Sequence, residues 1–210
     1  MIQLPTLMVE SQLWHSGQLR VVGIDEAGLG SLCGPVVAAA VLLPPHCQPI
    51  PGVRDSKTLS AQQRSPLYPA IHAQALAVGI GAASVAEIDR LNVLQASHLA
   101  MQRAVQRIGA YDHALIDGRD LIRLDLGAYT AMIDGDATSY AIACASIVAK
   151  VRRDRFMQRL GRRYPGYNWQ QNAGYGTRQH LQAVKTLGVT PWHRRSYKPI
   201  RQFLEQQTLV

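Results

Sequence analysis

An uninterrupted apolar run at residues 36–43 limits most strongly what this 210-residue chain can fold into. With Pro35 the segment reads PVVAAAVLL, and Pro44 and Pro45 close it at once. The run is far too short to cross a bilayer. A strand without polar alternation is buried on both faces, so we expect it inside a sheet that has helices packed on each side. A chain of this length suits one large domain, or a domain with an appendage.

Strand-like and helix-like patterns follow one another along the chain. We expect strands at 21–25, 35–43, 75–84 and 113–117, and helices at 60–74, 92–108, 138–162 and 177–187. Ser60 is a candidate N-cap for the first of these helices. Residues 1–18 have no clear period and are expected to form a poorly ordered lead-in. Strands and helices followed by helices alone indicate an α/β fold with a helical C-terminal extension.

The cysteines and the N-terminus indicate the compartment. Cys33, Cys47 and Cys144 are odd in number and widely spaced, with no Cys-x-x-Cys pair. That pattern argues against a disulfide framework and against a zinc site, and it fits a reducing cytosol. The N-terminus lacks a basic segment followed by an apolar core, so no secretory signal is expected. We therefore expect a cytoplasmic protein without a membrane partner.

Charge is divided unevenly between the two parts of the chain. Residues 1–149 carry 9 basic and 12 acidic side chains, a net −3, whereas residues 150–210 carry 13 basic and 2 acidic ones, a net +11. This division predicts a catalytic body to about residue 149 and a basic helical region from about 150 that binds a polyanion. We expect the two regions to form one domain over 19–200, followed by a tail at 201–210. A solvated basic surface is the simpler alternative, and the charge alone does not decide between them.

Four acidic side chains stand where apolar segments end. Asp25 and Glu26 follow the first strand, Asp117 ends another, and Asp136 precedes the long helix. Such acids can meet at one edge of a sheet, and clustered carboxylates persist only beside a compensating cation. Oxygen ligands favour Mg²⁺ or Mn²⁺, and a pair of these ions suits phosphodiester hydrolysis. Asp next to Gly is also common in ordinary turns, which is the alternative for Asp117 and Asp136 individually.

A glycine-containing turn, GLGSLCG at 28–34, follows the first strand. A dinucleotide-binding loop would lead into a helix, but here the third glycine falls one place late and Pro35 begins a strand. Asp25 and Glu26 would also repel a phosphate in the absence of a metal. The turn fits better as a backbone surface that presses against a nucleic-acid substrate.

Together these segments resemble the ribonuclease HII family, the type 2 ribonucleases H. The resemblance rests on GIDEAG (23–28), GPVVAAAV (34–41), DSK (55–57) with Leu59 and Ser60, IDG (116–118), GD (135–136), IACASIVAK (142–150) with Val151, Arg153 and Asp154, GY (174–175) with Thr177 and His180, and HRRSY (193–197). The matches keep the family's order and spacing from about residue 21 to 199, which covers most of the chain.

The resemblance implies a ribonuclease H-like fold with a central mixed β-sheet flanked by helices, and a C-terminal helical extension that grips the duplex. It implies that Asp25, Glu26, Asp117 and Asp136 are the catalytic ligands of Mn²⁺ or Mg²⁺. The implied reaction is hydrolysis of the RNA strand of RNA–DNA hybrids and nicking 5′ to ribonucleotides embedded in duplex DNA, by two metal ions, leaving a 3′-hydroxyl and a 5′-phosphate.

Substrate contacts are implied for a second set of residues: Gly28, Leu29, Gly30, Lys57, Ser146, Lys150 and Tyr175. The glycine turn would read the ribose 2′-hydroxyl, and Tyr175 would pack on the sugar at the RNA–DNA junction. Lys57, Lys150 and the arginines after Lys150 would contact phosphates.

The chain departs from the family's usual sequence at three places. The turn usually reads Gly-Arg-Gly followed by proline, but Leu29 and Ser31 stand here. Asp134 replaces a usual lysine two places before the last acid, and residues 172–173 read Asn-Ala where His-Lys is usual. These departures remove cationic side chains near the substrate, so we expect an active enzyme with a weakened or altered junction preference.

Other functions account for only part of the sequence. A nucleic-acid-binding module without catalysis would use the basic C-terminal third but not the acids, and a nucleotide-binding metabolic enzyme would not need that basic third. The sister family ribonuclease HIII has an extra N-terminal domain, whereas about 20 residues precede the first strand here. His180 and His193 are either proton-transfer groups or hydrogen-bonded structural side chains. We expect a monomer, and residues 202–204 (QFL) are too generic to identify a docking peptide for a sliding clamp.

Overall fold

The computed structural model describes residues 4–118 and 125–208, which contain a five-stranded mixed sheet in the order β3-β2-β1-β4-β5. The strands are β1 (Val21–Ala27), β2 (Val36–Leu42), β3 (Ala77–Ala83), β4 (His113–Asp117) and β5 (Tyr129–Met132). The first three pair antiparallel, whereas β4 runs parallel to β1 and β5 parallel to β4. Because β1 and β4 are parallel neighbours, their carboxyl ends meet at one edge of the sheet.

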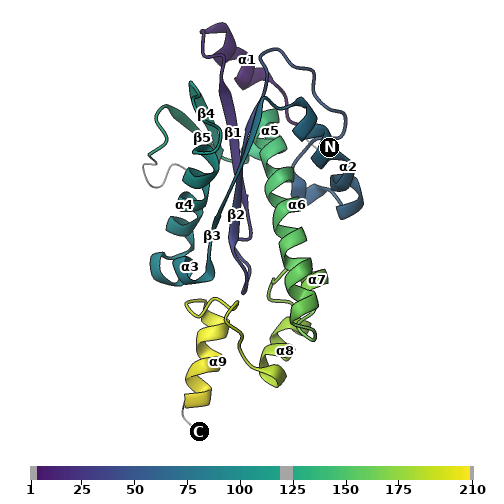
Figure 1. Ribbon diagram of the computed structural model, residues 1–210, viewed down its shortest axis with the longest axis vertical. Helices are drawn as coiled ribbons and strands as arrows, with labels where there is room; N and C mark the ends of the chain where they lie inside the picture. The colour runs from purple at the N-terminus through teal and green to yellow at the C-terminus, as the bar shows by residue number, and fades with distance from the viewer. Residues whose placement is uncertain (1–3, 119–124, 209–210) are drawn as a thin grey trace.

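Helices cover both faces of the sheet (Figure 1). On one face lie α2 (Ala61–Gln74) and the long α6 (Tyr140–Arg163), and on the other lie α3 (Val85–Leu91) and α4 (Val93–Val105). The remaining elements are α1 (Met8–His15), the 3₁₀ turn η1 (Ser56–Thr58), α5 (Gly135–Thr138), α7 (Trp169–Asn172), α8 (Arg178–Leu187) and α9 (Lys198–Thr208). Figure 1 shows α7, α8 and α9 gathered at the end of the molecule away from α1. No helix in the described ranges is long and apolar enough to cross a membrane.

Strand β2 is buried on both faces, as its uninterrupted apolar sequence predicts. Val36, Ala38, Ala40 and Leu42 pack into the core under α4, and the alternate residues Ala39 and Val41 pack under α6. Close approach of the helices depends on glycine in the neighbouring strands. A Cβ atom at Gly81 would overlap the carbonyl oxygen of Ala100 in α4, and one at Gly23 would overlap the main chain of Ala141 in α6.

The expected strands and helices agree with the structure apart from their end residues. The helix expected at 60–74 is α2, and Ser60 caps it in a reciprocal capping box with Gln63. The strand expected at 113–117 is β4. The helix expected at 138–162 is α6, preceded by the separate single turn α5. The helix expected at 177–187 is α8, with Thr177 as its N-cap.

The expectation of a poorly ordered lead-in is wrong for the part of 1–18 that the structure describes. Residues 8–15 form α1, in which Trp14 is 3% exposed and Glu10 fully buried. The Oε1 atom of Glu10 accepts hydrogen bonds from the Ser139 hydroxyl (2.6 Å) and from the Ala141 amide (2.8 Å) at the start of α6. These contacts join residues about 130 positions apart, so no local pattern could indicate them. Residues 1–3 lie outside the described residues.

The segment expected as a tail from 201 is helical through Thr208, because α9 continues across residue 200. Ile200 is fully buried, and Phe203 and Leu204 pack against a C-terminal core that also contains Leu32, Met157 and Trp169. Residues 209–210 lie outside the described residues. Helix α6 itself runs without a break past residue 150, with residues 140–149 all buried. One continuous helix therefore joins the sheet to the C-terminal core.

Candidate active site

Three of the four acids meet at the edge of the sheet where β1 and β4 end. The β1–β4 register pairs Ile24 with Ile116, so Asp25 and Asp117 are the next residues on adjacent parallel strands. Asp136 lies in α5, the turn between β5 and α6, and the amide of the preceding Gly135 donates to Oδ1 of Asp117 (2.7 Å). Carboxylate oxygens of Asp25, Asp117 and Asp136 all lie within 4.8 Å of one another.

Glu26 faces the same cavity but stands outside this group of three. It lines the cavity beside Asp25 and Asp117, and its amide donates to Oδ1 of Asp25 (2.6 Å). Burial raises the pKa of Glu26 to about 7, with a further contribution from the negative charge of Asp117. Glu26 is therefore an additional oxygen donor at the rim of the three-acid cluster.

The cluster is electrostatically unfavourable without a cation. Burial raises the pKa of Asp25 well above its usual range, and the charges of Glu26 and Asp117 raise it further. Burial and then the charge of Asp136 raise the pKa of Asp117. Repelling, desolvated carboxylates of this kind are stabilised by a hard divalent cation bound through oxygen. The donor set and its charge therefore fit Mg²⁺ or Mn²⁺.

Lys57 places its ammonium group against the acid cluster. Its Nζ atom donates to Oδ2 of Asp136 (3.0 Å), and its side chain is 71% exposed. Burial lowers the pKa of Lys57, but the hydrogen bond to Asp136 and the charges of Asp136, Asp25 and Asp55 outweigh this, so the pKa is raised. A single ammonium does not balance the several carboxylates around it.

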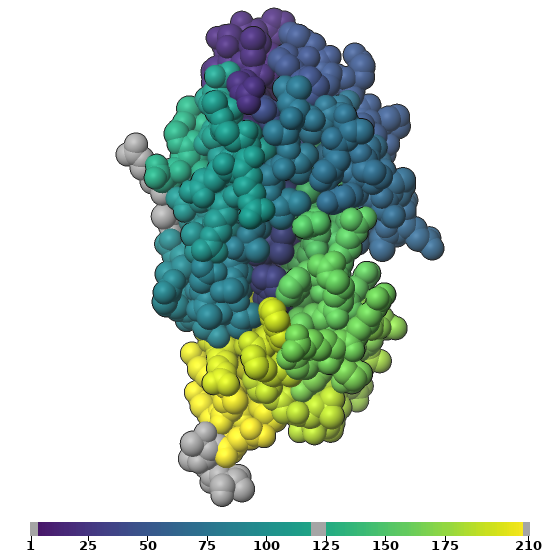
Figure 2. All heavy atoms as spheres, viewed as in Figure 1, coloured from purple at the N-terminus to yellow at the C-terminus, as the bar shows by residue number. Residues whose placement is uncertain are grey.

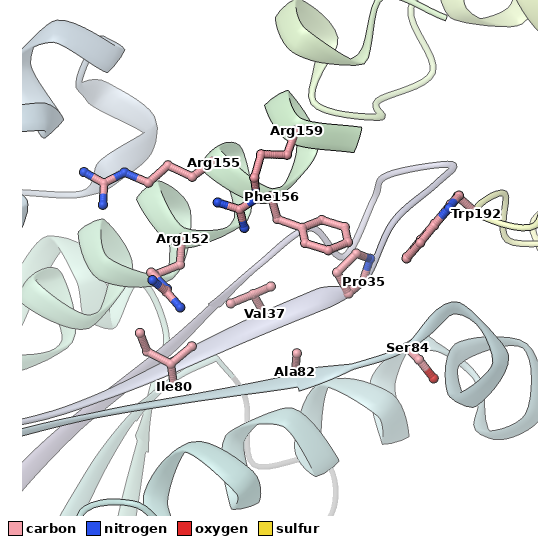
Figure 3. A pocket seen from close by; sticks show the side chains of 10 residues that line it. All are labelled: Pro35, Val37, Ile80, Ala82, Ser84, Arg152, Arg155, Phe156, Arg159 and Trp192. Atoms are coloured by element: carbon pink, nitrogen blue, oxygen red, sulfur yellow. The ribbon is translucent and has the colours of Figure 1, made fainter. Parts of the chain in front are cut away.

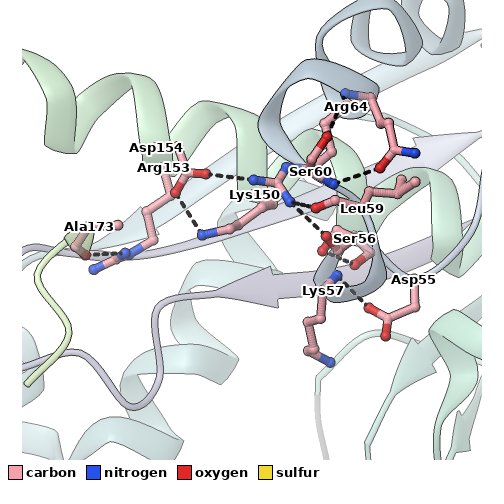
Figure 4. A network of polar contacts seen from close by, with 12 residues as sticks. Asp55, Ser56, Lys57, Leu59, Ser60, Arg64, Lys150, Arg153, Asp154 and Ala173 are labelled. Atoms are coloured by element: carbon pink, nitrogen blue, oxygen red, sulfur yellow. Dashed lines mark hydrogen bonds and ion pairs between the residues drawn. The ribbon is translucent and has the colours of Figure 1, made fainter. Parts of the chain in front are cut away.

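A polar network fixes the 3₁₀ turn that carries Lys57 (Figure 4). Oδ1 of Asp55 accepts from the Lys57 amide (2.8 Å), and the buried Arg64 donates to the carbonyls of Ser56 (2.8 Å) and Leu59. Asp154 of α6 bridges Arg64 (3.3 Å) and Lys150 (2.8 Å). Helix α6 thereby sets the positions of both lysines beside the acids.

A cavity of about 430 Å³ extends from the acids to the glycine turn. Its lining includes nearly all of the residues that the sequence selects: Asp25, Glu26, Asp117, Gly28, Leu29, Gly30, Lys57, Lys150 and Tyr175. Ser146 is the exception among the expected substrate contacts. It is 2% exposed, its Oγ lies 2.8 Å from Oγ of Ser56, and its hydrogen bond lowers the pKa of Asp25. Ser146 lies beneath the acids and orients Asp25, because α6 directs it into the protein.

The glycine turn is held by Arg194, which lies on the segment before α9 and is fully buried. Its guanidinium donates to the carbonyls of Gly28 (2.7 Å), Leu29 (2.7 Å) and Gly34 (3.0 Å). In a trans peptide the carbonyl and the following N–H point in opposite directions, so the amides of Leu29 and Gly30 point away from Arg194. Neither amide donates to another group of the described chain. The turn therefore presents two free backbone donors.

Arg153 of α6 is the second fully buried arginine, and it does not contact solvent as a phosphate-binding side chain would. It donates to the carbonyls of Pro35 (3.0 Å), Cys33 (3.1 Å) and Ala173 (2.8 Å). Its guanidinium also lies 5.7 Å from the ring centroid of Tyr175. The expectation that the arginines after Lys150 contact phosphates is therefore wrong for Arg153, which joins the glycine turn to the Tyr175 segment. The motif HRRSY signalled Arg194, but sequence alone did not show what either arginine does.

The two histidines have structural roles. Both are buried outside the acid cavity, with their Nε2 atoms 3.1 Å apart. Trp169 donates to Nε2 of His180 (2.9 Å), and Nδ1 of His180 bonds the Tyr175 carbonyl (2.9 Å). Nδ1 of His193 accepts from the Thr190 amide (2.9 Å). This network supports Tyr175 from behind, and the proton-transfer interpretation has no geometric basis.

The residues that depart from the family's usual sequence shape loops. Asp134 (φ +52°) and Ala173 (φ +48°) both have left-handed backbone conformations. Asn172 accepts from the Gly174 amide (2.8 Å) and donates to the Tyr167 carbonyl (2.9 Å), which forms the turn before Tyr175. Leu29 is 37% exposed at the cavity wall.

Comparison with known proteins identifies close sequence relatives. The family model described as Ribonuclease HII matches residues 22–200. A protein named Ribonuclease HII from Thermosynechococcus vestitus is 59% identical over 192 residues, covering 91% of this chain and 90% of the relative. A second protein of that name, from a Synechococcus species, is 52% identical over 199 residues, covering 94% of this chain and 90% of the relative.

Solved structures share the fold at lower sequence identity. The ribonuclease H2 of Pyrococcus horikoshii superposes with a TM-score of 0.70 at 24% identity, covering 89% of this chain and 98% of that one. A structure described as Bst-RNase HIII in complex with Mn²⁺ gives a TM-score of 0.70 at 18% identity, covering 92% of this chain and 71% of that one. The expected ribonuclease H-like α/β fold is confirmed.

Proposed function

Because the chain belongs to the ribonuclease HII family and is a metal-dependent endoribonuclease acting on RNA–DNA hybrids, we propose that its acid cavity also nicks duplex DNA on the 5′ side of an embedded ribonucleotide. The observation that carries the proposal is the convergence of Asp25, Asp117 and Asp136 within 4.8 Å beside a turn with free backbone donors. The products are a 3′-hydroxyl and a 5′-phosphate.

The acids divide into three core ligands and one at the rim. Asp25, Asp117 and Asp136 would hold the metal, and Glu26 would add a fourth carboxylate from the cavity wall. Two Mg²⁺ or Mn²⁺ ions bound there would activate water and stabilise the leaving oxygen of an in-line displacement. Ser146 orients Asp25, and the Gly135 amide orients Asp117. The acids are therefore preorganised by groups that do not touch substrate.

Substrate recognition is assigned to the glycine turn, Tyr175 and the two lysines beside the acids. The amides of Leu29 and Gly30 donate to the ribose 2′-hydroxyl, the one group that distinguishes a ribonucleotide from a deoxyribonucleotide. The ring of Tyr175, 39% exposed, packs on the sugar at the RNA–DNA junction. Lys57 and Lys150 neutralise the flanking phosphates. Residues up to about 149 thus supply the acids, the glycine turn and Lys57, and those from about 150 add Lys150 and Tyr175 to the grip on the duplex.

The test compares two duplexes of one sequence, the first with a single embedded ribonucleotide and the second with an all-RNA strand, with Mg²⁺ and Mn²⁺ in turn. Wild-type protein should cut both, and end analysis should show a 3′-hydroxyl. Asp25→Asn should lower the cleavage rate by about 1,000-fold or more while duplex binding stays within about twofold, because a ligand is lost and the basic surface is not.

Asp112→Asn is the matched control, because Asp112 precedes β4 at the end of the strand opposite to Asp117. The side-chain oxygen of an asparagine there can still accept the hydrogen bond that the Arg20 amide donates to Asp112 (2.8 Å). The cleavage rate of this variant should equal that of the wild type. An Asp25→Asn protein that turns over near the wild-type rate would remove Asp25 from the site. Cleavage of the all-RNA strand alone would refute the proposed nicking activity.

We further propose that the protein acts in the cytoplasm as a monomer. Cys33, Cys47 and Cys144 are all free thiols, as in a reducing compartment. The proposed metal ligands, the glycine turn and Tyr175 all come from a single chain.

A further inference from the structure

A second groove, with an apolar floor, lies between the sheet and the C-terminal half of α6 (Figure 3). Its volume is about 370 Å³. Val37 of β2 and Ile80 and Ala82 of β3 form the floor, with Val37 paired to Ala82 across the two strands. Phe156 and Trp192 close one end, their rings 5.5 Å apart in an edge-on arrangement. The groove can therefore bury a large apolar side chain.

Three arginines of α6 form the upper wall of this groove: Arg152, Arg155 and Arg159. All three are exposed, and none forms an ion pair with any described residue. Arg155 is held by stacking on Tyr68, with its guanidinium carbon 4.5 Å from the ring centroid. Asp154, the acid next to them on the helix, is already bonded to Arg64 and Lys150. The wall therefore carries uncompensated positive charge.

The groove is separate from the acid cavity. The two share no lining residue, because Lys150 and Arg153 turn toward the acids and the glycine turn, whereas Arg152 and Arg159 lie on another face of α6. Figure 2 shows the hollow between the green atoms of α6 and the blue atoms of the sheet, above the yellow C-terminal segment. A ligand can therefore occupy the groove without entering the acid cavity.

We propose that this groove binds an acidic segment of a protein partner, with one large apolar side chain seated on the floor and adjacent carboxylates on the arginines. Guanidinium groups pair with carboxylates in charge-assisted, often bidentate hydrogen bonds, and recognition of acidic motifs by arginine clusters is a common mode of peptide binding. A nucleic-acid backbone would use the arginines but would leave the apolar floor and the Phe156–Trp192 end without a partner. The combination favours an acidic peptide.

The probe is a fluorescein-labelled peptide, Gly-Asp-Glu-Asp-Leu-Phe-Gly, whose binding to the full chain is measured by fluorescence anisotropy. One control peptide carries amides in place of the acids, and another carries alanines in place of Leu-Phe. The parent peptide should bind at least about tenfold more tightly than either control, because each control removes one half of the recognition.

Variants of the protein locate the binding. The double variant Arg152→Gln/Arg159→Gln removes the charge, and Ala82→Trp fills the groove at an exposed position. Each should weaken peptide binding by about tenfold or more. The exposed Arg162 lies on the same helix outside the groove, so Arg162→Gln should bind the peptide as the wild type does. Cleavage of an RNA–DNA hybrid should be unchanged in Ala82→Trp, because Ala82 lines this groove and not the acid cavity.

Two results would overturn the proposal. Equal binding of the three peptides, or equal binding by Ala82→Trp and the wild type, would show that the groove does not hold the apolar side chain. Loss of affinity for a DNA duplex in the arginine double variant, without specific peptide binding, would make the groove a nucleic-acid contact. Neither result concerns Asp25, so the Asp25→Asn cleavage experiment tests the proposed nuclease activity independently of peptide binding.

Discussion

Arg194 determines the shape of the glycine turn through three main-chain contacts. A lysine at this position keeps the charge but, as a compact ammonium, cannot reproduce the planar fork that holds the carbonyls of Gly28, Leu29 and Gly34. Arg194→Lys should therefore lower the free energy of unfolding by about 2 kcal/mol, since buried carbonyls lose their donors. It should also lower kcat/KM for the single-ribonucleotide duplex about tenfold more than for the all-RNA hybrid, because recognition of one 2′-hydroxyl depends on this turn.

The ratio of the two kcat/KM values separates positioning from general destabilisation. Measured well below the melting temperature, a merely structural change would lower both activities equally and leave the ratio constant. A constant ratio in Arg194→Lys would show that the turn does not select the ribonucleotide through its backbone.

Leu29 lies at the position where the resemblance to ribonuclease HII leads one to expect arginine. Its side chain is 37% exposed at the cavity wall, so an arginine fits there and can reach a phosphate. One charge-assisted contact is worth about 1–2 kcal/mol, so Leu29→Arg should raise kcat/KM on the single-ribonucleotide duplex by roughly 5- to 30-fold. The hybrid should gain less, because its many 2′-hydroxyls offer several productive registers. Leu29→Gln, polar but uncharged, is the control, and equal, unchanged rates on both substrates would contradict the expectation.

At the residue scale, the sequence predicted the acids better than their supporting groups. Asp25 and Asp117 could be paired because each ends an apolar strand, and parallel strands bring such ends together. Ser146 and Arg153 share a helix whose orientation about its axis is set by tertiary packing. Only the structure therefore shows that Ser146 lies under Asp25 and that Arg153 is buried.

The elements around Tyr175 are held by neutral histidines. Burial, followed by the charge of His180, lowers the pKa of His193 to about 4, and burial lowers the pKa of His180. Each proton-free nitrogen already faces an N–H donor, from Thr190 in one case and Trp169 in the other. A proton added to His180 would therefore meet another donor instead of an acceptor, and a proton added to His193 would displace the hydrogen bond from the Thr190 amide.

This arrangement makes stability depend on pH with a definite sign. The unfolded chain binds protons on its histidines near pH 6.5, whereas folded His193 does so only near pH 4. The stabilisation is therefore complete above about pH 7 and is lost as the pH falls from about 6.5 to 4, by roughly 3 kcal/mol for this group. Urea unfolding at several pH values should show a shallower loss for His193→Gln than for the wild type. His72→Gln, on the exposed surface of α2, should retain the wild-type slope, and parallel slopes for both variants would refute the assignment.

Most elements with a local signal were predicted, although α3 was missed despite the capping box between Ser84 and Glu87 at its start. Helix α4 has a regular apolar face, and α2 begins at a serine cap, so both were visible in the sequence. Strand β5 is only four residues long and is not fully buried, and it is defined by its pairing with β4. Helix α1 depends on Glu10 reaching the start of α6. Contacts between residues far apart in the chain produce no periodic pattern in the local sequence.

On the scale of the whole molecule, the charge division corresponds to a spatial one, with α6 as the link. Its first half is buried against the sheet behind the acids, and its second half carries the basic side chains. The sequence predicted two regions of opposite charge. It did not predict that some of the basic side chains are internal ties, as Arg153 and Arg194 are, while others line a separate groove. The net charge of residues 150–210 therefore exceeds the positive charge that these residues present to a duplex.

Metal binding should be visible in the stability of the whole molecule. In the metal-free protein Asp25, Asp117 and Asp136 repel one another within 4.8 Å, so a bound cation removes an unfavourable interaction that the unfolded chain lacks. At 100 times its dissociation constant, Mn²⁺ should stabilise the wild type by about 2.7 kcal/mol, a rise in melting temperature of roughly 5–10 °C that EDTA reverses. Asp25→Asn removes one buried charge, so without metal it should melt above the wild type by a few degrees, and it should lose most of the Mn²⁺ effect. Asp112→Asn should retain the full effect. A wild-type melting temperature that Mn²⁺ leaves unchanged, or an equal gain in Asp25→Asn, would show that these carboxylates do not form the metal site.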